Sequence, residues 1–215
     1  KIKKYNKEYF AYTISNQNKK NSKFNFRTPE FNHPEEAEGF DTQQIDKFLA
    51  NVESEARIII CGASFTSGLT LKILKPLYER GVSLKIIYIM PEIEILSEVP
   101  SLQEKLVRGV LQEYARSGAF DEFKIISNSI ISSLAEPSSV MERYEKINDA
   151  IASTIYMLDT IRAQQPVSST VGPLKETSRI GSISVASLNP YEERSFFSLD
   201  NVSELVYHFG IHKTN

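Results

Sequence analysis

The chain of 215 residues has one cysteine, Cys61, almost no net charge and no long hydrophobic run. A single cysteine excludes an intrachain disulfide framework and fits a reducing compartment, so we expect a cytoplasmic location. A formal net charge of −2 supplies no field that would draw the protein to nucleic acid or to an anionic membrane. No apolar run approaches the roughly 18 residues of a membrane span. We therefore expect neither a nucleic-acid partner nor a membrane partner.

Hydrophobic residues make up 41% of the chain, which is enough to bury a core. A chain of this length holds one large domain, or one domain and part of another. The first residue is Lys1 rather than Met, so we expect the chain to be part of a longer one.

The hydrophobic pattern predicts strands that alternate with helices. Strands are predicted at 8–14, 57–61, 82–90 and 120–127, with a loop over 24–40. Helices are predicted at 41–54, 69–80, 101–116 and 139–163. Strands joined by helices through short connections form βαβ units, so we expect a parallel sheet with right-handed crossovers. The predicted fold class is α/β, with a Rossmann-like parallel sheet, flanking helices and a long central helix.

Composition changes after the long helix. Residues 164–178 are rich in Pro, Ser and Thr, which is typical of a linker. We therefore predict an α/β domain of the nucleotide-binding type over 1–163 and a β-rich C-terminal segment over 179–215, with strands at 179–188 and 191–198 and a strand or a short helix at 202–209. That segment is too short for an independent core, so we expect it to be part of a larger region or to dock onto the first domain.

One strand-to-helix turn is a candidate anion site. The apolar run at 57–61 stops at Gly62, and a second glycine, Gly68, precedes the helix that begins at Leu69. The first N–H groups of a helix have no intrahelical partner, and the helix dipole favours negative charge there. Most such turns bind nothing, however, and on this spacing alone a purely structural turn is the favoured interpretation.

Asn128 ends the strand at 120–127. Ligands of open α/β sheets lie beyond the carboxyl ends of the strands, so this position is suited to a ligand contact. The alternative is that Asn128 only turns the chain, as asparagine often does.

The order of these elements resembles the GTP-binding domain of the tubulin/FtsZ superfamily. The shared order is a strand, a glycine-containing loop, a helix, a strand ending at Pro91, a helix, a strand ending at Asn128, and a long helix. The segment Tyr144–Ala152 is similar to the start of the central helix in phage-encoded tubulins. The resemblance covers about residues 42–163. It implies GTP or GDP with Mg²⁺ as the ligand, and self-association or contacts with neighbouring subunits of a larger assembly.

The resemblance implies nucleotide-binding roles for eleven residues. The stretch that matches the family's phosphate loop is Gly62, Ala63, Ser64, Phe65, Thr66, Ser67 and Gly68. It keeps the family's residue type only at Gly62, Ser67 and Gly68. Ala63, Ser64 and Thr66 add side chains where the family has glycine, and Phe65 stands where a phosphate-facing threonine belongs. Glycines in such a loop permit positive φ and close approach of the ligand.

The other four residues match the family's contacts to the base. Asn128 matches the asparagine that hydrogen-bonds guanine, and Asn148 and Asp149 match the pair at which the central helix contacts the base. Tyr144 would stack on the base. The residues themselves leave other roles open: an exposed polar pair for Asn148 and Asp149, and core packing for Tyr144.

Two parts of the family pattern are missing from the sequence. No glycine precedes Gly39, so a first glycine-rich phosphate loop would lie upstream of Lys1. Residues 160–179 contain neither Asp nor Asn, and their only carboxylate is Glu176. In the family, acidic residues in this region orient the hydrolytic water, and without them water activation has no chemical agent.

We therefore predict a degenerate tubulin/FtsZ-like structural protein, a component of a protein assembly such as a phage virion, with little or no GTP hydrolysis. The alternative hypothesis is a phage-type tubulin-like GTP-binding protein that polymerises into filaments. Either would place the protein in the cytoplasm of a host cell or in a virion. A third hypothesis is an unrelated Rossmann-like enzyme domain that binds a different ligand at the same strand ends.

Other chemistries have little support in the sequence. His33 has no partner at metal-ligand spacing, and His208 and His212 lack the surrounding motif of a zinc site. Cys61 has no base beside it, and at the end of an apolar strand we expect it to be buried and inert.

Overall fold

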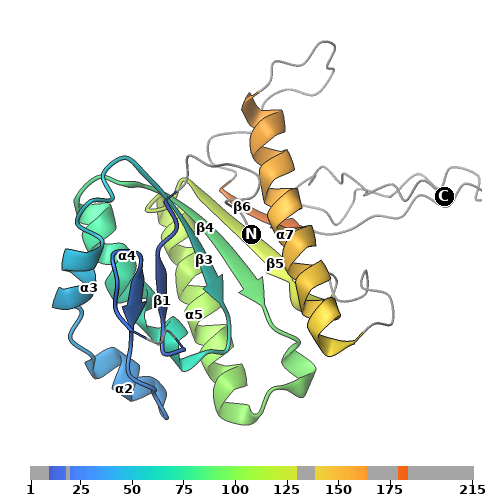
Figure 1. Ribbon diagram of the computed structural model, residues 1–215, viewed down its shortest axis with the longest axis horizontal. Helices are drawn as coiled ribbons and strands as arrows, with labels where there is room; N and C mark the ends of the chain where they lie inside the picture. Colours follow the sequence, from blue (N-terminus) through green and yellow to red (C-terminus); the bar gives the residue numbers. More distant parts are fainter. Residues whose placement is uncertain (1–9, 18–19, 130–138, 164–178, 184–215) are drawn as a thin grey trace, which may run out of the picture.

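The computed structural model describes residues 10–17, 20–129, 139–163 and 179–183. Its centre is a four-stranded parallel sheet in the order β3-β4-β5-β6 (Figure 1). The strands are β3 (Glu55–Cys61), β4 (Ser83–Met90), β5 (Glu122–Ser127) and β6 (Ile180–Ile183). The predicted α/β class with a parallel sheet is confirmed, because the runs predicted at 57–61, 82–90 and 120–127 and the start of the one at 179–188 form these strands.

Three helices flank the sheet. They are α4 (Thr70–Glu79), α5 (Glu98–Ser117) and α7 (Val140–Ala163). Two of the predicted helix ends carry glycines in the left-handed region: Gly81 follows α4 with φ 75°, and Gly118 ends α5 with φ 87°. Only glycine adopts this conformation at no steric cost, so these two residues stop the helices where the sequence predicted.

Alternating side chains of the strands build two cores, one on each face of the sheet. The first core lies on the face covered by α4 and α5 and includes Leu74, Leu77, Leu84, Ile86, Tyr88, Leu111 and Phe123. The second lies under α7 and consists of Ile87, Ile126, Ile147, Ile151, Ile155 and Ile183. Figure 1 shows α7 crossing one face of the sheet while α5 lies behind the other. Burying an isoleucine contributes about 1.5–3 kcal/mol, so the three isoleucines of α7 hold this helix on the sheet.

The N-terminal part is more ordered than the sequence indicated. The predicted loop at 24–40 contains a strand, β2 (Asn25–Arg27), which pairs in parallel with β1 (Thr13–Ser15), and a helix, α2 (Pro34–Gly39). The prediction of a loop was wrong because these elements are too short to show a periodic pattern. The proline at the start of α2 and the two glutamates in its first turn are helix-start signals that were available.

The first predicted helix is shorter than expected. Helix α3 covers Gln43–Phe48 rather than 41–54, and Leu49 ends it with its N–H donating to the Ile45 carbonyl. Between the other elements lie two short 3₁₀ helices, η1 (Phe65–Leu69) and η2 (Ile93–Ile95).

Strand β6 lies within the predicted C-terminal segment and pairs in parallel with β5, with Phe123 opposite Ile180 and Ile126 opposite Ile183. This part of the segment therefore completes the main sheet. The division into a domain, a linker and a C-terminal segment stays a prediction, because residues 164–178 and 184–215 lie outside the described residues. The strand predicted at 191–198 and the strand or short helix predicted at 202–209 also lie outside them. Of the strand predicted at 8–14, residues 10–14 are described, and only its end forms a strand, in β1.

Candidate functional site

The carboxyl ends of the parallel strands gather the predicted site residues at one edge of the sheet. Gly62 follows β3, Pro91 follows β4 and Asn128 follows β5. Neighbouring strands lie about 4.8 Å apart, so the ends of β3 and β5, with β4 between them, are about 10 Å apart. Helix α7 runs antiparallel to the strands and begins near this edge (Figure 1), because its C-terminal Asp159 contacts Arg57 in the first half of β3.

The loop after β3 is closed by its own hydrogen bonds. The Gly62 N–H donates to the Ile89 carbonyl of the neighbouring strand at 2.9 Å. The Ser64 carbonyl accepts the Ser67 N–H at 2.8 Å, the Ser67 hydroxyl at 2.5 Å and the Gln103 side-chain amide at 3.3 Å. The Ser67 side chain is buried, so its hydroxyl faces the loop rather than solvent. Three donors that could otherwise hold a phosphate, the Gly62 N–H and the N–H and hydroxyl of Ser67, are thus used inside the protein.

Position 62 must be a glycine because the side chains of Tyr88 and Pro91 leave no room for a β-carbon there. A β-carbon built at this position would lie 2.5 Å from the Tyr88 hydroxyl oxygen and 2.8 Å from Cδ of Pro91. No real β-carbon tolerates such contacts. The space that a glycine leaves open for a ligand in a phosphate loop is therefore filled by Tyr88 and Pro91.

The rest of the loop departs from a simple helix start. Ala63 has φ 61°, a left-handed conformation that is uncommon for a residue with a β-carbon. Phe65, Thr66 and Gly68 lie in η1, which leads into α4 at Thr70. The side chain of Phe65 lies outside the described part of the structure, so its predicted conflict with phosphate stays a prediction.

Asn128 follows β5, and the first turns of α7, which hold Tyr144, Asn148 and Asp149, begin near the same edge of the sheet. Asn128 is half-buried, and beside it the hydroxyls of Ser127 and Ser129 share a hydrogen bond of 2.7 Å. Asn148 is exposed, Asp149 is half-buried, and Tyr144 is 60% exposed. Tyr144 therefore does not pack in the core, and its face is open to a ligand or partner. The binding roles of these four residues stay predictions.

The sequence analysis missed a buried polar cluster beside the loop after β3, formed by Tyr88 of β4 and by Gln103, Glu104 and Arg108 of α5. The Glu104 side chain of α5 is 0% exposed and accepts a hydrogen bond from Nε of Arg108 at 2.6 Å. The Tyr88 hydroxyl and Oε1 of Gln103 are buried and, among the described residues, have no hydrogen-bond partner. The i, i+4 spacing of Glu104 and Arg108 was the one available signal, and it is more often a surface pair than a buried one.

The pKa values in this region reflect the same burial. Burial raises the pKa of the Tyr88 phenol, and the negative charge of Glu104 raises it further. The hydrogen bond to Glu104 raises the pKa of the Arg108 guanidinium. Because Glu104 is fully enclosed, this cluster has no access to a ligand at the sheet edge. Its physical effect is to hold α5 against the loop and β4.

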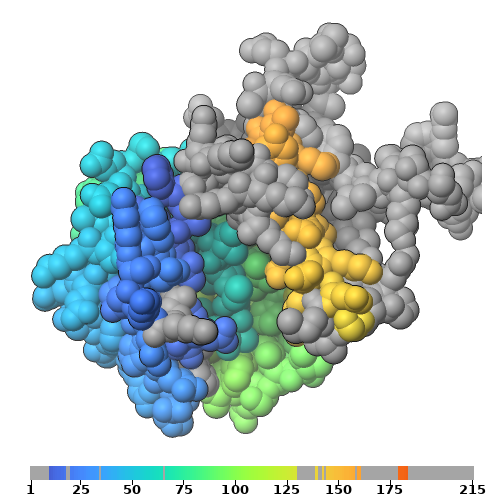
Figure 2. All heavy atoms as spheres, viewed as in Figure 1, coloured from blue at the N-terminus to red at the C-terminus, as the bar shows by residue number. Residues whose placement is uncertain are grey.

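The prediction that Cys61 is buried was wrong, because the structure leaves this residue exposed. It ends β3 on the face that carries α7, but the apolar core under α7 is built from β4, β5 and β6, and Ile59 on the same face of β3 is likewise 41% exposed. Figure 2 shows atoms of the central strands at the surface between the blue N-terminal elements and the yellow α7. The protein atoms that surround the sulfur still raise the pKa of the Cys61 thiol, so its nucleophilic thiolate form is disfavoured.

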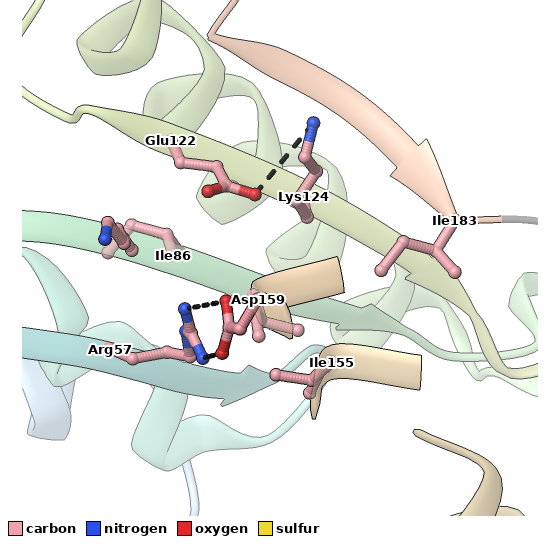
Figure 3. A pocket seen from close by; sticks show the side chains of 9 residues that line it. Arg57, Ile86, Glu122, Lys124, Ile155, Asp159 and Ile183 are labelled. Carbon is pink, nitrogen blue, oxygen red and sulfur yellow. Dashed lines mark hydrogen bonds and ion pairs between the residues drawn. The ribbon is translucent and has the colours of Figure 1, made fainter. Parts of the chain in front are cut away.

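A second group of charges lines a hollow between the sheet and α7, near the amino ends of the strands (Figure 3). Arg57 of β3 binds Asp159 of α7 through both guanidinium nitrogens, with NH2 2.7 Å from Oδ1. Lys124 lies 4.0 Å from Glu122 beside this pair. The hollow is lined by three cationic side chains, Arg57, Lys85 and Lys124, and by two carboxylates, Glu122 and Asp159. Each cation is paired with a carboxylate, Lys85 with Glu55 of β3. The Arg57–Asp159 pair attaches α7 to the sheet.

The fold and this edge define an α/β protein with a Rossmann-like parallel sheet. Comparison with protein-family models and with curated proteins gave no match. None of the helices in the described ranges is long and apolar enough to cross a membrane. Within those ranges, no three His, Cys, Asp or Glu side chains gather as a metal site would require.

Proposed function

We propose that the protein is a tubulin/FtsZ-like scaffold without a working nucleotide site, and that it serves as a structural component of a protein assembly. The observation that carries this proposal is the closure of the loop after β3. The Gly62 N–H and the N–H and hydroxyl of Ser67 all donate to carbonyl oxygens of the protein, and Tyr88 fills the space beside Gly62.

A phosphate at this loop would need free backbone N–H donors and room for close approach. To bind, it would have to break the bond from Gly62 to Ile89 and displace the Tyr88 ring. Each lost hydrogen bond costs about 0.5–1.5 kcal/mol, and the displaced ring belongs to the core. The missing acidic residues after the long helix point the same way, because hydrolysis would lack the groups that orient water.

A second candidate is a GTP-binding protein that forms filaments. It is favoured by the position of Asn128 near the carboxyl edge that also holds the loop and the exposed Tyr144 and Asn148. If this candidate holds, Asn128→Ala should weaken guanine nucleotide binding by about 1–3 kcal/mol, because a group on the base edge loses its partner. Unchanged affinity would remove Asn128 from the site.

The deciding experiment is to denature the purified protein and analyse the released small molecules by anion-exchange chromatography. The native protein is titrated with GTP in parallel, with ATP as the control nucleotide. We expect no released nucleotide and no saturable binding up to about 1 mM GTP, where binding is worth only about 4 kcal/mol. We also expect any assembly seen by sedimentation to be independent of GTP. Stoichiometric GDP or GTP, or assembly that requires GTP, would reject the scaffold and support the filament-forming candidate.

A further inference from the structure

Helix α5 presents an apolar face to solvent. The α5 stripe consists of Ile95, just before the helix, and Val99, Leu102, Leu106, Val110 and Tyr114, whose exposed fractions range from 36% to 76%. Positions three or four residues apart lie on one side of a helix, so the five helical members form a continuous line. From Val99 to Tyr114 this line is about 22 Å long at 1.5 Å per residue.

We propose that the α5 stripe is the interface with a second copy of this chain, in which two α5 helices pack antiparallel about a twofold axis at Leu106. An interface of this kind is isologous, so the stripe must be complementary to itself. With the axis at Leu106, Val99 lies opposite the partner's Tyr114, Leu102 lies opposite the partner's Val110, and the two copies of Leu106 meet. Every large apolar side chain of the helical stripe then faces another one.

The charges at the two ends of α5 select the antiparallel arrangement. Glu98 begins the helix and Arg116 lies in its last turn, and both are exposed on the same flank of the stripe. An antiparallel pair places Glu98 beside the partner's Arg116 at each end. A parallel pair would instead bring Glu98 level with the partner's Glu98 and Arg116 level with the partner's Arg116, on opposite flanks of the interface, so neither charge would meet its opposite. Arg116 also pairs with Glu113 of its own helix, so the partner's Glu98 adds a second carboxylate to an existing ion pair.

The area of the stripe suits a second copy. Its six side chains together expose about 500–600 Å² per copy, which gives a buried total close to the lower end, about 1,200 Å², of specific interfaces. Gly109 lies on the flank of the stripe, and nothing lies within 4 Å of the position of its missing β-carbon. This open space lets the two helix backbones approach closely.

The inference deepens the proposed function and rests on it for the expectation that the protein assembles. It adds what the proposed function leaves open, namely the surface and the partner. It does not depend on whether the loop after β3 binds nucleotide, so the two can fail separately.

The test is disulfide crosslinking of the full chain in a Cys61→Ser background, because Cys61 is the only cysteine and is exposed. Leu106→Cys should form a disulfide-linked dimer in most of the protein under mild oxidation, because the two cysteines meet at the axis. Leu102→Cys alone should give little dimer, because its copies lie about 12 Å apart along the helices. Mixing Leu102→Cys with Val110→Cys should give the mixed dimer.

Sedimentation of proteins without added cysteines provides the second readout. The wild type should be a dimer at about 100 μM, and Leu106→Lys should weaken dimerisation at least about tenfold by placing two charges at the axis. Tyr156→Lys on α7, across the sheet, is the matched control and should leave the dimer intact, since Tyr156 is also exposed. Glu98→Arg should weaken the dimer, and combining it with Arg116→Glu should restore it.

A monomeric wild type, or efficient self-crosslinking of Leu102→Cys in place of Leu106→Cys, would overturn the proposal. A monomer whose stripe is protected by another segment of its own chain would overturn it as well. Nucleotide release measured on the same samples separates the two proposals. A crosslinked dimer that carries GTP would reject the scaffold but keep the interface, whereas an empty monomer would reject the interface alone.

Discussion

Replacing Gly62 with alanine distinguishes a glycine kept for packing from a glycine kept for a ligand. In the structure, the added β-carbon would lie 2.5 Å from the Tyr88 hydroxyl oxygen, 2.9 Å from Cζ of Tyr88 and 2.8 Å from Cδ of Pro91. Gly62 does not have a positive φ, so alanine meets no backbone strain. The whole cost therefore comes from overpacking against two well-packed side chains.

Overpacking of this kind costs about 1–3 kcal/mol. Alanine also lowers the conformational entropy of the unfolded chain, which stabilises the folded protein by about 0.4–1 kcal/mol. We therefore expect the free energy of unfolding to fall by about 1–2 kcal/mol in total. For a chain of this size each kcal/mol shifts the melting temperature by about 2–4 °C. The assay is thermal and urea unfolding of the nucleotide-free protein, with Gly39→Ala as the control, since nothing lies within 4 Å of a β-carbon at that position.

Tyr88→Phe identifies the group responsible. Removing the hydroxyl oxygen eliminates the closest of the three contacts but leaves Cζ and Pro91, so Gly62→Ala should cost less in the Tyr88→Phe background. We expect a coupling of about 1 kcal/mol between the two sites. If Gly62→Ala leaves unfolding unchanged and lowers only nucleotide affinity, the glycine serves a ligand, and both the packing argument and the scaffold proposal fail.

Three further changes test other parts of the structure. Asp159→Ala should lower the free energy of unfolding by about 1–3 kcal/mol and increase hydrogen exchange in α7, because Arg57, whose side chain is only 13% exposed, loses a bidentate partner. The control is Glu79→Ala, which removes an exposed ion pair with Lys75 and should change the free energy of unfolding by less than about 0.5 kcal/mol. Burial raises the folded-state pKa of Tyr88 above its ordinary value of 10, so the contribution of the neutral phenol to stability is complete below pH 10 and is lost as the pH rises further. The wild type should therefore lose stability more steeply above pH 10 than Tyr88→Phe does. Parallel curves of stability against pH for the two proteins would contradict this assignment. Gly118→Ala should cost about 1–2 kcal/mol in unfolding measurements, because φ 87° strains any residue with a β-carbon, and an unchanged stability would mean that the turn relaxes.

The sheet and its long helices could be predicted because their sequences carry strong patterns. The strands at 57–61, 82–90 and 120–127 are short segments rich in isoleucine and other β-prone apolar residues, which is typical of strands in a parallel sheet. Once these runs are parallel, their carboxyl ends must meet at one edge, which is why Gly62 and Asn128 were placed correctly. The elements within 24–40 could not be predicted, because a three-residue strand and a six-residue helix carry too little periodicity.

Whether the loop after β3 is open to a ligand depends on contacts between residues that are distant in the sequence. Nothing around Gly62 in the sequence indicates that Tyr88 of the neighbouring strand fills the space beside it, or that Gln103 of α5 reaches the Ser64 carbonyl. Cys61 was placed wrongly for a related reason. The end of an apolar run indicates burial, but burial also requires a covering element, and α7 covers β4 to β6 while leaving the end of β3 open.

Helix α5 shows what periodicity leaves undetermined, because it is apolar on two sides. Val107, Leu111 and Ala115 face the sheet, while Leu102, Leu106 and Tyr114 face outward. A polar contact favours the observed rotation of the helix, since the hydrogen bond from the Gln103 side chain to the Ser64 carbonyl forms only with that side inward.

Rotating α5 about its axis to bury its outward leucines would expose Leu111 and move the Glu104 carboxylate out of its present buried site. No rotation of this helix on one sheet can bury both of its apolar faces. A helix that is hydrophobic on opposite sides is stable in water when protein covers both sides. The sheet covers one side of α5, and its outward leucines are the strongest physical reason, independent of any nucleotide, to expect this chain to function as part of an assembly.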